Sequence, residues 1–241
     1  MTRHRILLAG MVCLLPLAVG CAGGGGSSQA SAADKQWAMP NKNYSGTRFS
    51  SLDSINAANV KDLKVAWSFS TGVLRGHEGG PLVVGSTMYV HTPFPDLVYA
   101  LDLTKEGAPV KWKYAPKQDP QVMPIACCDV VNRGVTYADG KIFMNQLDAH
   151  TVALDAETGK EIWKVAQGDY GDGQTMTSAP MVVKDKVITG ISGGEFGVRG
   201  FVTANDVKDG HQVWRMYSTG DRKSTRLNSS HGTLSRMPSS A

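Results

Sequence analysis

Apolar and polar residues alternate with a period of two in short runs along the middle of this 241-residue chain. Such alternation is typical of half-buried strands, and no segment keeps the 3.6-residue period of an amphipathic helix. Turn-forming residues interrupt paired runs at Gly85-Ser86, at Asp139-Gly140 and around Lys184-Asp185-Lys186. These interruptions predict β-hairpins, so the pattern as a whole predicts an all-β protein.

A repeat of about fifty residues organises these strands. Residues 98–116, 151–169 and 201–220 each contain an alternating strand that reaches Ala-x-Asp, then a polar turn, then a strand with a tryptophan. A repeat of this length suits one four-stranded blade of a β-propeller, and about three blades fit before Gly220. We expect the tryptophans to pack between neighbouring blades, and Trp67 to lie in a similar strand without its hairpin partner. The repeat tryptophans are Trp112, Trp163 and Trp214.

The N-terminal 33 residues predict export. Arg3 and Arg5 precede an apolar run from Ile6 to Val19 that is too short for a permanent membrane span. Two cleavage sites compete: "AVGC", a lipobox that would make Cys21 a lipid anchor, and "ASA" just before residue 33. Either site predicts a periplasmic protein, and cleavage at the lipobox would add a membrane tether with a flexible glycine-serine linker.

Residues 221–241 read as a sequencing-adapter artefact. The codons of a common adapter translate to the segment "DRKSTRLNSSH", and its far end gives "SRMPSSA". We therefore restrict the predicted propeller segment to residues 34–220 and expect the natural protein to continue beyond it.

These two ends explain the basic composition. The formal net charge is +4, yet Arg3 and Arg5 together with four basic residues against one aspartate in 221–241 exceed that value. The remaining body is slightly acidic, so the sequence gives no support for nucleic-acid binding. The body keeps two cysteines, the adjacent Cys127 and Cys128, which an oxidising compartment would tend to join.

Four stretches, "LRGHEGGPLVV", "YVHTPFP", "ACCDVVNRG" and "GISGGEFGVRGFVTA", together with the tryptophan repeat, resemble the pyrroloquinoline-quinone (PQQ) dependent alcohol dehydrogenases. The resemblance is nearest to the methanol dehydrogenase branch and its lanthanide-using members, and it covers about residues 37–220. It implies an eight-bladed propeller with PQQ on its axis above a metal ion, either Ca²⁺ or a lanthanide.

The resemblance also implies a role for individual residues. Cys127 and Cys128 match a disulfide packed flat on the quinone, although two buried thiols stay an alternative. Glu195, which lies between glycines in an apolar strand pattern, matches a metal ligand, and a hard cation prefers such carboxylate oxygens; a solvated glutamate is the alternative, because a lone glutamate is usually exposed. The matched cofactor-binding residues are Glu78, Cys127, Cys128, Arg133, Thr177, Ser192, Gly193 and Gly194, where the glycines could also mark an ordinary strand bulge.

The implied activity is oxidation of a small primary alcohol, methanol in the first place, with electrons passed to a cytochrome c. In the family the base and the remaining metal ligands lie in later blades, so we expect the chain as written to be inactive and assign it no catalytic residue. A non-enzymatic lipoprotein propeller of outer-membrane assembly and a longer-chain alcohol dehydrogenase are the alternatives. The sequence leaves open the substrate range, the metal and the oligomeric state, including a homodimer.

Overall fold

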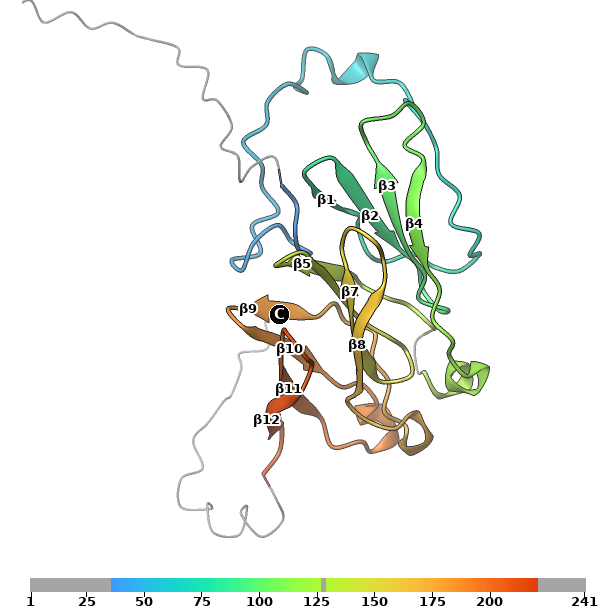
Figure 1. The fold of residues 1–241 in the computed structure, drawn as a ribbon, viewed down its shortest axis with the longest axis vertical. Coiled ribbons are helices and arrows are strands. Elements are labelled where there is room, and N and C mark those ends of the chain that lie inside the picture. Colours follow the sequence, from blue (N-terminus) through green and yellow to red (C-terminus); the bar gives the residue numbers. More distant parts are fainter. Residues whose placement is uncertain (1–35, 127–128, 221–241) are drawn as a thin grey trace, which may run out of the picture.

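The computed structural model describes residues 36–126 and 129–220. Within this part, twelve strands form three four-stranded antiparallel sheets, each built from strands consecutive in sequence (Figure 1). The innermost strands β1 (Leu82–Val84), β5 (Val135–Ala138) and β9 (Met181–Val183) contact one another in series, so the sheets are arranged as successive blades. The predicted all-β fold with three blades is confirmed, while the predictions for the export signal, Cys127, Cys128 and residues 221–241 fall outside the described residues.

The first blade contains β1 (Leu82–Val84), β2 (Thr87–His91), β3 (Val98–Asp102) and β4 (Val110–Tyr114). The second contains β5 (Val135–Ala138), β6 (Lys141–Asn145), β7 (His150–Asp155) and β8 (Glu161–Ala166). The third contains β9 (Met181–Val183), β10 (Lys186–Gly190), β11 (Phe201–Asp206) and β12 (Gln212–Tyr217). Four short 3₁₀ turns complete the fold: η1 (Val60–Asp62), η2 (Pro120–Ile125), η3 (Tyr170–Asp172) and η4 (Gly194–Phe196).

The hairpin turns lie where the sequence placed them. Gly85-Ser86 joins β1 to β2, and Asp139-Gly140 joins β5 to β6 with φ angles of 48° and 72°. Two successive positive φ angles are the signature of a type I′ hairpin turn, which matches the right-handed twist of the strands. The third turn is shorter than expected, because Lys186 already begins β10 and Lys184 takes φ 54°.

Two of the three repeat tryptophans join neighbouring blades. Trp112 and Trp163 are 9% and 8% exposed, and their indole N–H groups donate to the carbonyls of Ala156 (3.0 Å) and Val207 (3.2 Å) in the next repeat. Trp214 is 41% exposed, because no further blade covers it within the described residues. The prediction that the tryptophans pack between blades is therefore confirmed for Trp112 and Trp163, and it is wrong for Trp214 in the described part of the chain.

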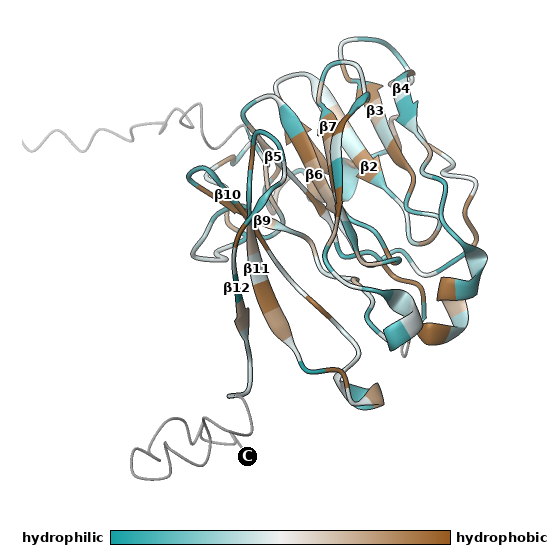
Figure 2. Cartoon of the chain, turned by 60° about the horizontal axis from the view of Figure 1, so that its bottom comes forward, coloured by the Kyte–Doolittle hydropathy of each residue, from teal (hydrophilic) through white to brown (hydrophobic). Residues whose placement is uncertain are grey.

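The middle strands are rich in hydrophobic residues, which are brown in Figure 2, and many of these residues belong to the buried core. In β6 and β7 four consecutive residues are buried, because both faces of the second blade are covered by a neighbouring blade. This is why these strands read as apolar runs rather than as strict alternation.

Trp67 does not lie in a strand, contrary to the prediction. A strand requires a hydrogen-bonded neighbour, and none of the described residues pairs with this segment. Trp67 instead packs, partly buried, against the cluster formed by Leu97, Tyr99, Leu101 and Ala108.

An N-terminal segment crosses the inner edge of all three blades and appears in blue in Figure 1. Trp37 pairs with Val83 of β1 through two backbone hydrogen bonds of 2.7 and 3.1 Å. The Ala38 carbonyl accepts from the Tyr137 amide of β5 (2.7 Å), and the Tyr44 hydroxyl donates to the Val182 carbonyl of β9 (2.5 Å).

Within the described residues, no helix has the length and apolar character that crossing a bilayer would require.

Candidate functional site

Three of the predicted site residues meet at the inner edge of the blades. The Arg133 guanidinium lies 3.0 Å from Glu78 through Nε and donates to the Thr177 hydroxyl (2.7 Å) through Nη1. Each residue lies in the loop that leads into the first strand of its blade: Glu78 before β1, Arg133 before β5 and Thr177 before β9. The repeat thus brings equivalent loops of three blades together although the residues lie 44 or more positions apart in sequence.

Arg133 keeps donors available beyond this cluster. An arginine has five N–H donors in a rigid planar fork, and the described residues give partners to one on Nε and one on Nη1. Both ends of the Arg133–Glu78 pair are about half exposed, at 49% and 45%. The remaining N–H groups can therefore bind a planar anion such as a carboxylate.

A cavity of about 100 Å³ lies beside this cluster. It brings together four predicted residues and is lined also by the residues that flank the cysteine pair in sequence. The lining residues are Ala126, Asp129, Val131, Arg133, Thr175, Thr177, Ser192 and Glu195. A larger hollow of about 580 Å³ shares Arg133 and includes Glu78, Trp37 and Arg48 in its wall.

The two glycines of the "SGG" stretch differ in backbone conformation and in the space around them. The Ser192 amide donates to the Thr175 carbonyl (2.8 Å), and Gly193 is buried with φ 114°. A Cβ on Gly193 would collide with the Gly173 carbonyl oxygen, so this position requires glycine. Gly194 has open space around its Cβ position and no positive φ, so the described structure places no such demand on it.

Glu195 lies in a 3₁₀ turn and not in a strand, which corrects the expected strand pattern. Gly193 and Gly197, on either side of η4, both adopt left-handed backbone angles that end any extended run. The side chain is exposed and lines the cavity beside Arg133. An exposed carboxylate at the open inner edge of three blades can serve as an oxygen ligand for a hard cation.

Sequence reasoning missed two polar residues of the cavity wall, Asp129 and Thr175. Asp129 has φ 71°, and its carboxylate lies 3.6 Å from Arg75, while Thr175 supplies the backbone bridge to Ser192. Asp129 follows the cysteine pair directly, and aspartate tolerates left-handed angles better than most residues. That position was the signal available in the sequence.

Two buried titratable side chains, His91 and Asp96, contact the residue that precedes Arg133. Burial lowers the pKa of His91 to about 4, so this imidazole is neutral at pH 7. Burial raises the pKa of Asp96 to about 6, although hydrogen bonds from Asn132, Leu147 and Gln118 act in the opposite direction. Both side chains bond to Asn132, the residue that precedes Arg133.

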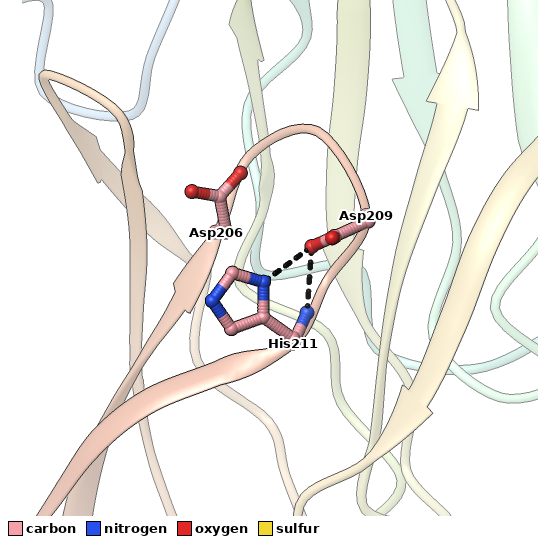
Figure 3. A group of neighbouring side chains, drawn as sticks. All are labelled: Asp206, Asp209 and His211. Carbon is pink, nitrogen blue, oxygen red and sulfur yellow. Dashed lines mark hydrogen bonds and ion pairs between the residues drawn. The ribbon is translucent and has the colours of Figure 1, made fainter.

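A second cluster of titratable groups lies in the turn between β11 and β12 (Figure 3). The Asp209 carboxylate accepts from the backbone N–H of His211 (3.1 Å) and lies 2.7 Å from its Nδ1, and these bonds lower the pKa of Asp209. Asp206 lies 3.7 Å from the ammonium of Lys186. The hydrogen bonds within the turn and the ion pair with Lys186 explain why the three side chains lie close together.

Three four-stranded blades with a loop-borne polar cluster at their inner edge define this part of the chain as a β-propeller segment with a candidate binding site. Residues 37–238 match the family described as "PQQ: Glucose/ethanol/alcohol dehydrogenase, beta-propeller domain", and the chain belongs to this family.

Its relatives include a lanthanide-dependent methanol dehydrogenase of Methylacidiphilum fumariolicum (strain SolV), 59% identical over 80% of this chain and 32% of the relative. A second, from Methylorubrum extorquens (strain ATCC 14718 / DSM 1338 / JCM 2805 / NCIMB 9133 / AM1), is 63% identical over 73% of this chain and 29% of the relative. The solved structure of a europium-containing methanol dehydrogenase superposes with a TM-score of 0.77 at 59% identity, covering 79% of this chain and 33% of that one. The chain spans about a third of the length of these relatives.

Proposed function

We propose that this chain forms the first blades of a PQQ-dependent dehydrogenase that oxidises a small primary alcohol, methanol in the first place. The observation that carries the proposal is the convergence of Glu78, Arg133 and Thr177 from three loops, with Ser192 and Glu195 on the same cavity. The names of the relatives support methanol as substrate and a lanthanide as metal. Calcium is the alternative metal, because both cations favour carboxylate oxygens.

The described residues fit PQQ by their chemistry. PQQ is flat and carries carboxylates, which suit the free N–H groups of Arg133 and the hydroxyls of Thr177 and Ser192. The cavity of about 100 Å³ is below the roughly 300 Å³ of ordinary cofactor pockets. The chain therefore supplies one side of the pocket, and Glu195 one oxygen ligand of the cation.

PQQ, when bound, supplies the quinone that accepts the electrons of the alcohol. The residues of this chain bind and orient it. Arg133 neutralises a carboxylate, Glu78 fixes the guanidinium through Nε, and Thr177 fixes Nη1. Among the described residues we assign none as the catalytic base, and we expect the 241-residue chain alone not to reduce a dye in the presence of PQQ.

The location and the electron acceptor are part of the proposal. The signal-like residues 1–33 support a periplasmic protein, and "AVGC" supports a lipid anchor on Cys21. A relative from Methylobacterium organophilum, 54% identical over 82% of this chain, is named methanol dehydrogenase [cytochrome c] subunit 1. That name supports a cytochrome c as the acceptor here.

A titration of the full-length gene product with PQQ, with Ca²⁺ or a lanthanide present, tests the proposal. We expect saturable binding, at least tenfold weaker in Arg133→Ala because one charge-assisted bidentate contact is lost. Lys105→Ala, an exposed cation of the β3–β4 turn, should bind as wild type does. No PQQ binding with either metal would refute the dehydrogenase and favour the non-enzymatic propeller. Comparison of kcat/KM for methanol and longer alcohols then decides the substrate.

A further inference from the structure

The backbone on both sides of Arg133 is held by one buried asparagine. Asn132 is 2% exposed, its carbonyl lies 3.2 Å from Nε2 of His91, and its side-chain oxygen accepts from the Gly134 amide (3.0 Å). The Arg133 amide itself donates to the Thr177 carbonyl (2.9 Å). Three consecutive residues are thus fixed, with the guanidinium-bearing residue in the middle.

Asp96 holds the side chain of this asparagine. Its carboxylate accepts from Asn132 Nδ2 (3.0 Å), from Gln118 Nε2 (2.8 Å) and from the Leu147 amide (2.9 Å). Asp96 is buried, and the described residues form no ion pair with it. A buried carboxylate without a cation is costly. All three partners are donors, so only an acceptor-only group satisfies them, and an asparagine in this place would turn one donor toward another.

His91 connects the two loops that carry Arg133 and Glu78. Its ring is buried against the backbone of Gly79, so closely that a Cβ on Gly79 would overlap it. The same ring contacts the Asn132 carbonyl through Nε2. His91 is the last residue of β2, and Asp96 lies in the connection to β3. One corner of the first blade therefore fixes the position of the loop before β5 in the second blade.

We propose that His91, Asp96 and Asn132 are positioning residues that set where the Arg133 guanidinium meets a carboxylate of PQQ. The proposal rests on the proposed function, and none of the three residues lines either hollow that Arg133 borders. Each acts through the backbone of residues 132–134 or through the Glu78 loop. In metal sites, loss of a contact that orients a ligand weakens binding by about 10- to 100-fold, and we expect an effect at the lower end of this range here.

A double-mutant cycle on the full-length gene product, with Kd for PQQ as the readout, tests this. Asp96→Asn should raise Kd about tenfold in the wild-type background and less than twofold in the Arg133→Ala background, because its effect passes through that guanidinium. An equal increase in both backgrounds, or a lowered Tm with unchanged Kd, would overturn the proposal. If the wild-type protein binds no PQQ, the proposed function fails instead.

Two further variants keep the test informative if Asp96→Asn does not fold. His91→Gln retains a donor for the Asn132 carbonyl, whereas His91→Phe removes it, so Kd should rise more for Phe than for Gln. Thr203→Val is the matched control, because it deletes a buried hydrogen bond to Gln167 (2.9 Å) in the third blade. It should lower Tm and leave Kd unchanged; equal Kd values for Gln and Phe at His91 would count against positioning.

Discussion

Arg133 owes its place to contacts from all three blades. Its side chain meets Glu78 of the first blade and Thr177 of the third, and its backbone is bonded to the Thr177 carbonyl. At half exposure the Arg133–Glu78 pair adds little to stability. The pair matters because it fixes the orientation of a planar donor group, which a lysine would not provide.

The two buried titratable groups behind Arg133 should affect stability in opposite directions. The pKa of Asp96 is raised from 3.8 to about 6, so the folded state keeps a proton that the unfolded state loses, and stability falls as pH rises between these values. The pKa of His91 is lowered from 6.5 to about 4, so the unfolded state binds the extra proton, and stability rises from about pH 4 to 6.5. In the wild type the two slopes largely cancel.

In Asp96→Asn the contribution of Asp96 is removed, so the rise of stability with pH that His91 causes should become visible. The free energy of unfolding of the variant, relative to wild type, should increase by ~2 kcal/mol between pH 4 and 6, because most of the Asp96 pKa shift is expressed in this range. His91→Phe should show the opposite trend in the same range. Urea unfolding at several pH values measures both, and curves parallel to wild type would contradict the assignment.

Gly193→Ala should destabilise the chain by about 1–3 kcal/mol, because alanine at φ 114° is strained and its Cβ collides with the Gly173 carbonyl. Gly194→Ala is the matched control one residue on, with open space and no positive φ, and should change stability by less than about 0.5 kcal/mol. Thermal unfolding of both variants measures the difference. Equal losses of stability would contradict the prediction, because they would show that the surrounding chain relieves the clash.

At the scale of elements, the repeat explains both the packing and the site. In the first two blades, the tryptophan of the fourth strand donates to a carbonyl in the turn between the third and fourth strands of the next blade. The same register places the loops before β1, β5 and β9 at the inner edge, where the cluster forms. Stability and site geometry therefore depend on one repeating arrangement.

Gly159→Ala tests the tryptophan contact between blades. A Cβ there would lie 2.5 Å from Trp112 Cε3, at φ 70°. Gly140→Ala has almost the same φ, 72°, with nothing near the Cβ position, so it carries only the cost of the backbone angle, about 1 kcal/mol. Gly159→Ala should cost a further 1–3 kcal/mol or so from overpacking. Denaturant unfolding with tryptophan fluorescence compares them; identical losses would exclude a role for the ring contact.

At the scale of the whole molecule, the N-terminal segment is bonded to β1, β5 and β9 and joins the blades at their inner edge. Tyr44→Phe removes the bond to the Val182 carbonyl, worth about 1 kcal/mol, so amides of β9 should exchange about fivefold faster. Tyr170→Phe loses an exposed bond to Asp119 and should leave β9 exchange unchanged. Hydrogen-exchange mass spectrometry reads both, and unchanged β9 exchange in Tyr44→Phe would contradict a role in joining the blades.

The sequence by itself determined the elements that local patterns specify. Alternation, the fifty-residue repeat and the turn dipeptides predict the strands, the blades and the hairpins, because each depends on residues close together in the chain. The motifs around Glu78, Arg133, Thr177 and Glu195 predict a shared site by resemblance.

Only the tertiary structure decided which of these features find partners. Within residues 36–126 and 129–220, Trp67 has no strand neighbour and no further blade covers Trp214, while Glu195 lies in a turn closed by two left-handed glycines. The support of Arg133 by Asp96 and His91 was equally hidden, since it joins residues 36 or more positions apart. Burial and hydrogen bonding between distant segments arise only when the chain folds, so a local sequence pattern does not predict them.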